Sequence, residues 1–298
     1  MAHGLMPGFV DSHCHLWDLA ATPQEWIDPD SMGAIHRDFR VADLDSVLAE
    51  RGARGAVIVQ ANNTLAETRF LLDEALASAL DHTVVGWIDL TGDVHAQLAG
   101  FAGHPAAARL VGIRHLAHVD PDPVWLERDD VAAGVRALAQ AGLTFDIVVR
   151  AQQLPQATAL ARRVPEASFV LDHLGNPPQA AAEQLRWSAD LRQLAELPNV
   201  VAKISGLASS DAADAVDAAD AADGAAADRF PAAAISVALD AFGPSRLMFG
   251  SDWPLVRLSD AGYGGWVDRV LSALDALSDS ERTHILRDTA SATYGGAA

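Results

Sequence analysis

The stretch Phe9-Val10-Asp11-Ser12-His13-Cys14-His15-Leu16-Trp17 places two histidines on one apolar segment near the N-terminus. Successive side chains of a strand point to opposite faces, so His13 and His15 are expected to share a face. Two imidazoles on one face can bind a divalent metal ion, or can act as acid–base groups without one. They could also be polar strand residues whose hydrogen bonds are satisfied by neighbours. The stretch by itself leaves these alternatives open.

A second stretch with the same pattern, Arg246-Leu247-Met248-Phe249-Gly250-Ser251-Asp252-Trp253-Pro254, lies near the other end of the chain. It also consists of an apolar segment followed by a charged residue and a loop that contains proline. The His13 and His15 pair would meet Asp252 if the first and last strands were neighbours. This condition favours a closed barrel, in which the first and last strands lie side by side.

The composition is that of a globular protein. The chain has 298 residues, of which 50% are hydrophobic and 20% charged, so it can form one large barrel or two ordinary domains. The formal net charge of −19 argues against a nucleic acid or an anionic membrane as partner, because phosphate contacts require a basic surface. A small anionic substrate remains compatible with this charge if a few Arg and Lys residues converge.

The sequence also predicts where the protein is found. Its single cysteine excludes an internal disulfide framework and a cysteine-based zinc cluster. The chain contains neither an apolar run of about 18 residues nor the basic and hydrophobic regions of a signal peptide. We therefore expect a cytoplasmic protein.

Eight apolar segments alternate with segments of helical periodicity along the chain. Apolar strands that alternate with helices indicate a parallel sheet covered on both faces. Eight such units in about 250 residues favour a single (β/α)8 barrel of the α/β class over an open sheet, with one domain over 1–298. No Gly-x-Gly-x-x-Gly follows the first strand, so a dinucleotide-binding fold is not indicated. The expected strands are 9–17, 55–60, 84–90, 110–116, 144–149, 168–175, 200–206 and 246–252, and the expected helices are 43–51, 64–79, 94–103, 129–141, 153–163, 181–196 and 232–241.

Two segments do not fit the alternation of strands and helices. Residues 16–40 are rich in Trp and Pro and are expected to form a long loop over a site. Residues 209–228 are nearly all Ala and Asp, with an acidic residue at every third position over much of the segment. A period of three drifts around a helix, so these acids would not form one ligand-binding face. We expect a solvated acidic loop here, with a lid over the site as the alternative.

In (β/α)8 enzymes the active site lies at the carboxyl ends of the strands. His173 stands there in Asp172-His173-Leu174-Gly175-Asn176-Pro177-Pro178, and with His13, His15 and Asp252 it could converge on one ion. Asp172 is expected to face the opposite way if the strand stays regular. The other histidines, which are His3, His36, His82, His95, His104, His118 and His284, are expected to be structural or at the surface. The expected strand ends also carry Gln60, Asp89, Arg114, His115, Arg150 and Lys203.

These motifs resemble those of the amidohydrolase-2 branch of the amidohydrolase superfamily. They are the first-strand motif around His13 and His15, Gly112-Ile113-Arg114-His115, the motif around His173, Lys203-Ile204-Ser205-Gly206-Leu207, and Met248-Phe249-Gly250-Ser251-Asp252-Trp253-Pro254. Within the branch, the chain is most similar to the sugar-lactone and 2-pyrone-4,6-dicarboxylate lactonase group. The resemblance covers about 9–294 and implies a (β/α)8 barrel that hydrolyses a substrate at a carbonyl.

The resemblance also implies a set of metal ligands. The family's His-x-His pair corresponds to His13 and His15, its Asp-His-x-Gly histidine to His173, and its last-strand aspartate to Asp252. Binuclear members bridge two metals through a strand lysine or glutamate, for which this sequence has no clear equivalent. At most one divalent metal, expected to be zinc, is therefore implied. Some lactonases of this branch work without a metal, so the resemblance leaves open whether the metal is dispensable.

We expect the protein to open a small lactone that is carboxylated or polyhydroxylated. In this hypothesis Asp252 takes a proton from the attacking water and returns it to the ring oxygen, and the three histidines stabilise the oxyanion with or without zinc. Arg114 and His115 cannot both face inward from a regular strand. Trp26 and Trp253 are, like Trp17, more typical of packing than of substrate stacking. The expected substrate-binding residues are Arg114, His115, Lys203, Trp17 and Gln60.

Other functions remain open at this stage. A zinc-dependent nonoxidative decarboxylase of the same superfamily, or a hydrolase of another carboxylic ester, would use a similar site. A non-catalytic binding or scaffold protein on a barrel is the alternative from another class. The sequence is compatible with a homo-oligomer but does not specify the number of subunits.

Overall fold

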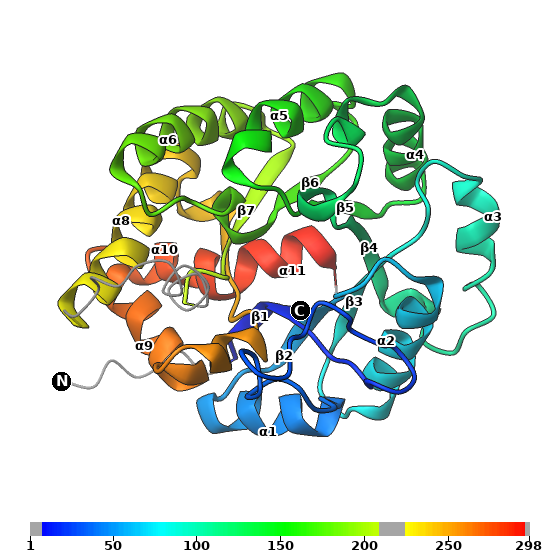
Figure 1. The fold of residues 1–298 in the computed structure, drawn as a ribbon, viewed down its shortest axis with the longest axis horizontal. Coiled ribbons are helices and arrows are strands. Elements are labelled where there is room, and N and C mark those ends of the chain that lie inside the picture. Colours follow the sequence, from blue (N-terminus) through cyan, green and yellow to red (C-terminus); the bar gives the residue numbers. More distant parts are fainter. Residues whose placement is uncertain (1–7, 209–223, 296–298) are drawn as a thin grey trace.

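A computed structural model describes residues 8–208 and 224–295 of the chain. Its centre is a parallel sheet of eight strands that pair in sequence order, from β1 to β8. The strands are short and almost wholly buried, because helices cover one side and the other side faces the barrel interior (Figure 1). They are β1 Val10–Cys14, β2 Gly55–Val59, β3 Thr83–Gly86, β4 Leu110–His115, β5 Thr144–Ile147, β6 Phe169–Leu171, β7 Val200–Ile204 and β8 Leu247–Phe249.

The barrel closes where the first strand meets the segment that follows the last. The backbone N–H of Asp252 donates to the His13 carbonyl at 2.8 Å, and the N–H of His15 donates to the Trp253 carbonyl at 2.6 Å. The Ser12 hydroxyl donates to the Phe249 carbonyl at 2.6 Å. These hydrogen bonds confirm the expectation that the first and last strands are neighbours in one (β/α)8 barrel. Three of the residues in these hydrogen bonds, His13, His15 and Asp252, were expected to bind a metal.

Helices follow the strands and form the outer layer (Figure 1). Their ends are set by local sequence signals: α1 ends at Gly52, which has a left-handed φ of 72°, and the Thr64 side chain accepts the N–H of Glu67 at the start of α2. None of the described helices is long and apolar enough to span a membrane. The helices are α1 Val41–Arg51, α2 Leu65–Ala77, α3 Val94–Ala99, α4 Asp129–Gln140, α5 Leu154–Arg163, α6 Ala181–Ala195, α8 Gly224–Phe242, α9 Gly262–Ala273, α10 Asp279–Thr283 and α11 Thr289–Tyr294.

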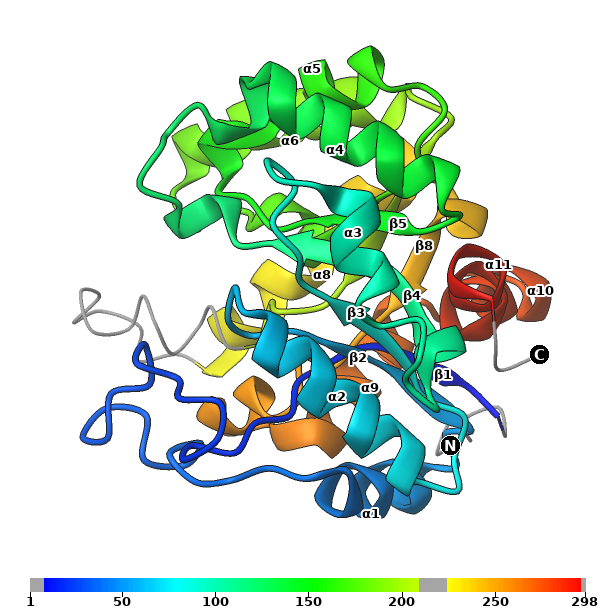
Figure 2. The same cartoon turned by 90° about the vertical axis from the view of Figure 1, so that its right-hand side faces the viewer.

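The last helix, α11, covers the end of the barrel at which the strands begin (Figure 2). Ala290 and Tyr294 of this helix pack into a buried cluster with Val10, Val57 and Val170 from three strands. The long segment 16–40 has neither helix nor strand, as expected, and it lies toward the opposite end, where the strands finish. The barrel is therefore closed by α11 at the end where the strands begin, and loops lie at the end where the strands finish.

The structure departs from the sequence expectations in its details. The expected strand 168–175 stops at Leu171, and residues 172–175 form a tight turn. The helices after β8, between 262 and 294, were not expected. Of the acidic segment, residues 209–223 lie outside the described residues, whereas 224–228 begin α8 instead of continuing a loop.

Candidate functional site

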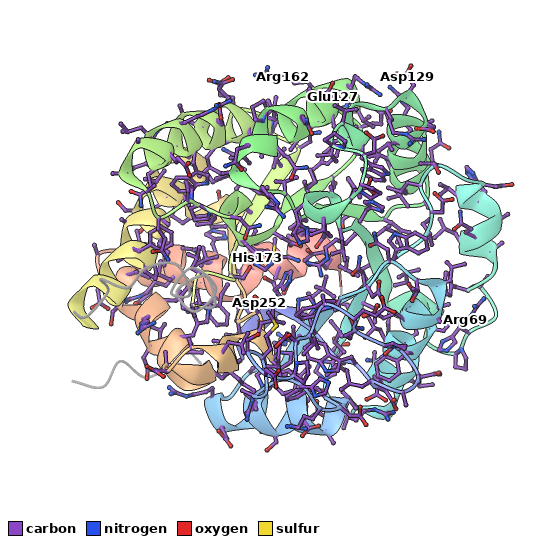
Figure 3. The ribbon with its side chains drawn as sticks, viewed as in Figure 1. Arg69, Glu127, Asp129, Arg162, His173 and Asp252 are labelled. Carbon is purple, nitrogen blue, oxygen red and sulfur yellow. The ribbon has the colours of Figure 1, made fainter. Side chains whose placement is uncertain are left out.

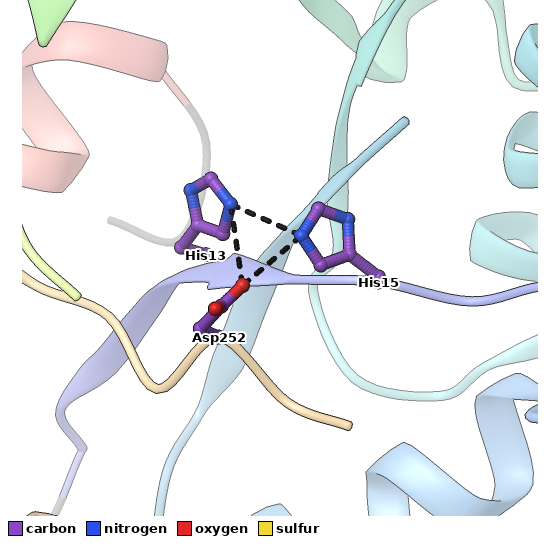
Figure 4. Close-up of side chains that lie close together, drawn as sticks. All are labelled: His13, His15 and Asp252. Atoms are coloured by element: carbon purple, nitrogen blue, oxygen red, sulfur yellow. Dashed lines mark hydrogen bonds and ion pairs between the residues drawn. The ribbon is translucent and has the colours of Figure 1, made fainter. Parts of the chain in front are cut away.

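Four side chains from three strand ends meet at the seam between β1 and β8. The Nε2 atoms of His13 and His15 are 3.2 Å apart, and Asp252 Oδ1 lies 3.2 Å from His15 Nε2 and 3.8 Å from His13 Nε2 (Figure 4). The ring of His173 packs against that of His13 with centroids 4.5 Å apart. Figure 3 shows His173 and Asp252 near the middle of the barrel, far from labelled surface residues such as Arg162. The sequence-predicted cluster is thus brought together.

The contacts of His15 decide which of its ring nitrogens carries the proton. His15 Nδ1 lies 2.8 Å from the carbonyl oxygen of Val59, which can only accept a hydrogen bond. A neutral His15 therefore carries its proton on Nδ1 and turns the Nε2 lone pair toward Asp252 Oδ1, which is also an acceptor. Two acceptors 3.2 Å apart repel each other unless a proton or a cation lies between them. His13, His15 and Asp252 form one of the groups of side chains that could hold a metal ion.

Two residues of the cluster have uncommon backbone conformations. Asp252 has φ 60° and His173 has φ 53°, both in the left-handed region, which is uncommon for residues other than Gly and is adopted among them most often by Asn, Asp and His. Each such residue costs about 1–3 kcal/mol and persists where the surroundings fix it, often at functional sites. Gly206 provides the space for the His173 ring, because a Cβ atom at Gly206 would lie 2.4 Å from His173 Nδ1. The same Nδ1 is hydrogen-bonded to the Ser205 hydroxyl at 2.9 Å.

A buried group of charged residues lies behind His13, inside the barrel. Lys203 Nζ donates to Asp146 Oδ2 at 2.7 Å and is 3.0 Å from Asp172 Oδ1. Arg114 Nη1 donates to Asp172 Oδ2 at 2.9 Å. His13 Nδ1 lies 3.3 Å from both Lys203 Nζ and Asp172 Oδ1. Two cations and two carboxylates thus balance each other in a place where unpaired charge would be very unfavourable.

The electrostatics favour neutral imidazoles at His13 and His173 and ionised carboxylates at Asp252 and Asp172. Burial lowers the pKa of His13 well below its usual value, and burial likewise lowers the pKa of His173. Burial acts to raise the pKa of Asp252, but the neighbouring histidines, His173 first among them, outweigh it, and the pKa falls to about 2. Burial has the same effect on Asp172, where Lys203 and His13 outweigh it and hold the pKa well below its usual range. Neutral imidazoles and an ionised carboxylate are the forms that ligate metals.

The expected orientation of Asp172 was wrong. It was expected to face away from the barrel interior, but it is fully buried and contacts Arg114, Lys203 and His13. The alternation rule does not apply here, because β6 ends at Leu171 and the turn lets Asp172 and His173 both point inward. Asp146, Ser205 and Tyr294 were not expected at the site either. Ser205 stands in the Lys-x-Ser-Gly motif, and that motif was the only available signal for it.

The residues expected to bind substrate lie in different surroundings. Arg114 faces His13 and Asp172, whereas His115 stacks on Trp125 and contacts Asp120, so the two point in different directions, as the alternation predicts. Lys203 and Gln60 are fully buried, and the Gln60 amide donates to the Arg114 carbonyl at 3.0 Å. Their substrate contacts stay predictions.

The tryptophans and the remaining histidines mostly have structural contacts. Trp17 is fully buried, packs edge-on against Trp26 and Phe39, and donates to the Arg37 carbonyl, and Trp253 packs on Phe39. His82 is buried and pairs with Asp45 at 2.7 Å. His118, just after β4, is half-buried, and burial together with the charge of Arg114 lowers its pKa to about 4.

The barrel, with its His-x-His pair, third histidine and aspartate at the strand ends, is typical of a class of hydrolases built on (β/α)8 barrels, and the comparisons agree with this class. Residues 10–296 match the model of the amidohydrolase family, so the chain belongs to this family. It is 36% identical to an L-fucono-1,5-lactonase of Burkholderia multivorans over 97% of this chain and 94% of that protein. A Burkholderia ambifaria L-fucono-1,5-lactonase is 34% identical, over 87% and 85% of the two chains. These findings confirm the resemblance predicted from the motifs.

A solved structure that contains a metal is also similar to this chain. The structure of a Burkholderia multivorans amidohydrolase with bound Zn has a TM-score of 0.85 and 35% identity to this chain, covering 96% of this chain and 99% of that one. In the present chain, the atoms of His13, His15 and Asp252 that could bind a metal lie within 4.8 Å of one another, as do those of His13, Asp172 and His173. Asp172 Oδ1 also makes no well-directed hydrogen bond and is buried. It lies 3.3 Å from His13 Nδ1 and, although Lys203 Nζ is also near it, can accept the Nδ1–H that His13 would carry with a metal on Nε2.

Proposed function

We propose that this protein hydrolyses a sugar-acid 1,5-lactone, with L-fucono-1,5-lactone as the first substrate to test. The observation that carries the proposal is the convergence of His13, His15, His173 and Asp252 at the barrel seam, on a chain whose relatives include two named L-fucono-1,5-lactonases. A lactone requires water to attack its carbonyl and requires the ring oxygen to leave with a proton. The carboxylate of the cluster can accept the proton of the attacking water and return it to the ring oxygen, and the imidazoles can stabilise the charge that develops on the carbonyl oxygen.

Asp252 is the proton carrier in this proposal. It is ionised at neutral pH, since its pKa is about 2, and it can take a proton from the attacking water. Oδ1 is the atom that faces the cluster. As the tetrahedral intermediate collapses, the carbon–oxygen bond of the ring breaks and the proton passes from Asp252 to the ring oxygen. The product is the open hydroxy acid, which ionises and releases one proton to the solution.

His13, His15, His173 and Asp252 would hold one divalent metal, for which zinc fits the nitrogen-rich ligand set. Bound there, the metal would act as a Lewis acid and favour deprotonation of water near neutral pH. The protein's own contribution is orientation. The Val59 carbonyl fixes the His15 ring, Ser205 is hydrogen-bonded to the His173 ring, and Asp172 lies on the Nδ1 side of His13.

The role of Asp252 is tested by Asp252→Asn with Asp45→Asn as a matched control. Both substitutions neutralise a carboxylate that contacts a histidine, but Asp45 pairs with His82 outside the cluster. We expect Asp252→Asn to lower kcat/KM for L-fucono-1,5-lactone by at least about 100-fold, because it removes the proton acceptor. Asp45→Asn should leave kcat/KM near the wild-type value, even where it lowers the melting temperature.

The assay follows proton release with a pH indicator and subtracts the spontaneous opening of the lactone. A panel of other sugar-acid lactones and dicarboxylate lactones, run beside it, defines the stereochemistry that the protein accepts. Wild-type turnover in Asp252→Asn would contradict the proposed role of this residue.

A further inference from the structure

The buried charged group behind His13 extends to the last helix of the chain. The Tyr294 hydroxyl, at the end of α11, donates to Asp146 Oδ2 at 2.6 Å. Thr144 donates to the other oxygen, Asp146 Oδ1, at 3.0 Å. Lys203 Nζ donates to the same Oδ2 atom as Tyr294, at 2.7 Å, and lies 5.3 Å from the centre of the Tyr294 ring. Tyr294 therefore contacts both Asp146 and Lys203.

Asp146 is fixed on all sides. It is fully buried, and three donors satisfy its two oxygens. Burial and the nearby Asp146 charge raise the pKa of Tyr294 well above its usual value, so the hydroxyl stays protonated and donates. The shortest contact of the Lys203 ammonium is to Asp146. Because Asp146 is itself held in place, the ammonium has little freedom to move. Asp146 of β5 and Tyr294 of α11 thus fix the position of Lys203 from the α11 side.

The contacts of Lys203 connect this arrangement to the proposed site. Its ammonium is 3.0 Å from Asp172 Oδ1 and 3.3 Å from His13 Nδ1, so it lies between Asp146 and the rear of the His13 ring. Asp172 is held from the other side by Arg114. The direction of His13 Nε2, which faces His15 and Asp252, depends on what contacts its Nδ1 edge.

We infer that Asp146 and Tyr294 are positioning residues that hold Lys203 and Asp172 against the Nδ1 edge of His13 and so fix the direction of its Nε2 atom. The inference rests on the proposed role of His13 and deepens it. It assigns a functional role to the helix that closes the far end of the barrel. Neither residue touches the lactone in this arrangement, because both lie behind His13.

The test compares Tyr294→Phe and Asp146→Asn with Tyr263→Phe as the matched control. Tyr263 is the chain's other tyrosine and is buried on α9, where its hydroxyl lies near Asp11 and makes no well-directed hydrogen bond. Tyr294→Phe keeps the ring that packs near Lys203 and removes only the hydroxyl. If Asp146→Asn does not fold, because it leaves Lys203 with one carboxylate fewer, the tyrosine pair still decides the question.

Three measurements are made on the full chain. The first is the dissociation constant of zinc, measured by competition with a chelator. The second is kcat and KM for L-fucono-1,5-lactone. The third is the ¹⁵N chemical shifts of the His13 ring, which require neither turnover nor metal. A lactone that is not turned over would affect only the second measurement, so failure of the proposed function can be told apart from failure of this inference.

We expect Asp146→Asn to weaken zinc binding and lower kcat by about 10- to 100-fold, as is typical for partners of a metal ligand. Tyr294→Phe, one hydrogen bond further away, should lower both by about fivefold with KM nearly unchanged. Both variants should shift the His13 nitrogen resonances, and their combined effect should be smaller than the product of the single effects. Tyr263→Phe should leave all three measurements at wild-type values.

A purely structural role gives a different pattern. If Tyr294→Phe lowers the melting temperature but leaves the zinc dissociation constant, kcat and the His13 shifts unchanged, the inference is wrong and Tyr294 serves only to close the barrel. The same conclusion follows if Tyr263→Phe reproduces the losses, since any buried hydroxyl would then have the same effect.

Discussion

Glu67 illustrates how a single buried carboxyl makes stability depend on pH. It is fully buried at the start of α2, accepts the N–H of Ala61 at 2.8 Å, and has one oxygen without a hydrogen bond. Burial raises its pKa to about 7. Because the pKa is raised on folding, Glu67 contributes stability that is complete below its ordinary pKa of 4.5 and is lost as the pH rises through about 7.

Glu67→Gln should remove this dependence, because the amide keeps an acceptor for Ala61 and cannot ionise. The loss between pH 4.5 and pH 7 in the wild type is on the order of 3 kcal/mol. Urea unfolding at pH 5 and pH 8 measures it. We expect Glu67→Gln to gain stability relative to the wild type at pH 8 and to gain little at pH 5. An equal difference at both values would mean that Glu67 is not protonated in the folded protein.

At the residue scale, strand alternation was enough to predict that His13 and His15 share a face. It failed for Asp172, because the rule holds only while the strand continues, and β6 ends one residue earlier. Asp146 and Tyr294 could not be predicted, since the partners of a buried carboxylate depend on which strands and helices become neighbours. The sequence spacing of 148 positions between the two carries no sign of contact.

At the element scale, the turn after β7 determines whether His173 can reach the cluster. Gly206 has φ 70°, and a Cβ atom there would collide with the His173 ring. Gly206→Ala should therefore displace His173 and lower kcat by about 10-fold or more, as a small misplacement of a catalytic group does. The matched control is Gly52→Ala at the end of α1, which has nearly the same φ, 72°, but open space around the position.

Both glycine variants should lose about 1 kcal/mol or more of stability from the left-handed conformation alone. Only Gly206→Ala should also lose activity, and chemical denaturation beside steady-state kinetics separates the two effects. Equal activity in the two variants would show that the His173 ring adapts. The strands could be predicted as elements because each is a short apolar run. The helix α9 is the one that the eighth unit requires after β8, whereas α10 and α11 have no place in a simple alternation of eight units.

At the scale of the whole molecule, the number and order of the strands could be predicted, and with them the closure of the barrel. Eight parallel strands in sequence order place the first beside the last, so the histidine pair and Asp252 meet across the seam. The way in which the far end is closed by α11 could not be predicted, because it depends on packing between the last helix and several strands. The fold therefore follows from the pattern of the chain, and the support of the site follows from its packing.

The most direct test of the account is the opening of L-fucono-1,5-lactone by the purified protein after chelation and again after zinc is restored. We expect turnover to be lost with the metal and to return with about one zinc per chain, because His15 Nε2 and Asp252 Oδ1 would both be ligands of the ion. Turnover that survives complete chelation would contradict the metal site and leave the imidazoles and Asp252 as the whole catalytic group. A zinc-loaded protein that opens no sugar-acid lactone would contradict the proposed reaction itself.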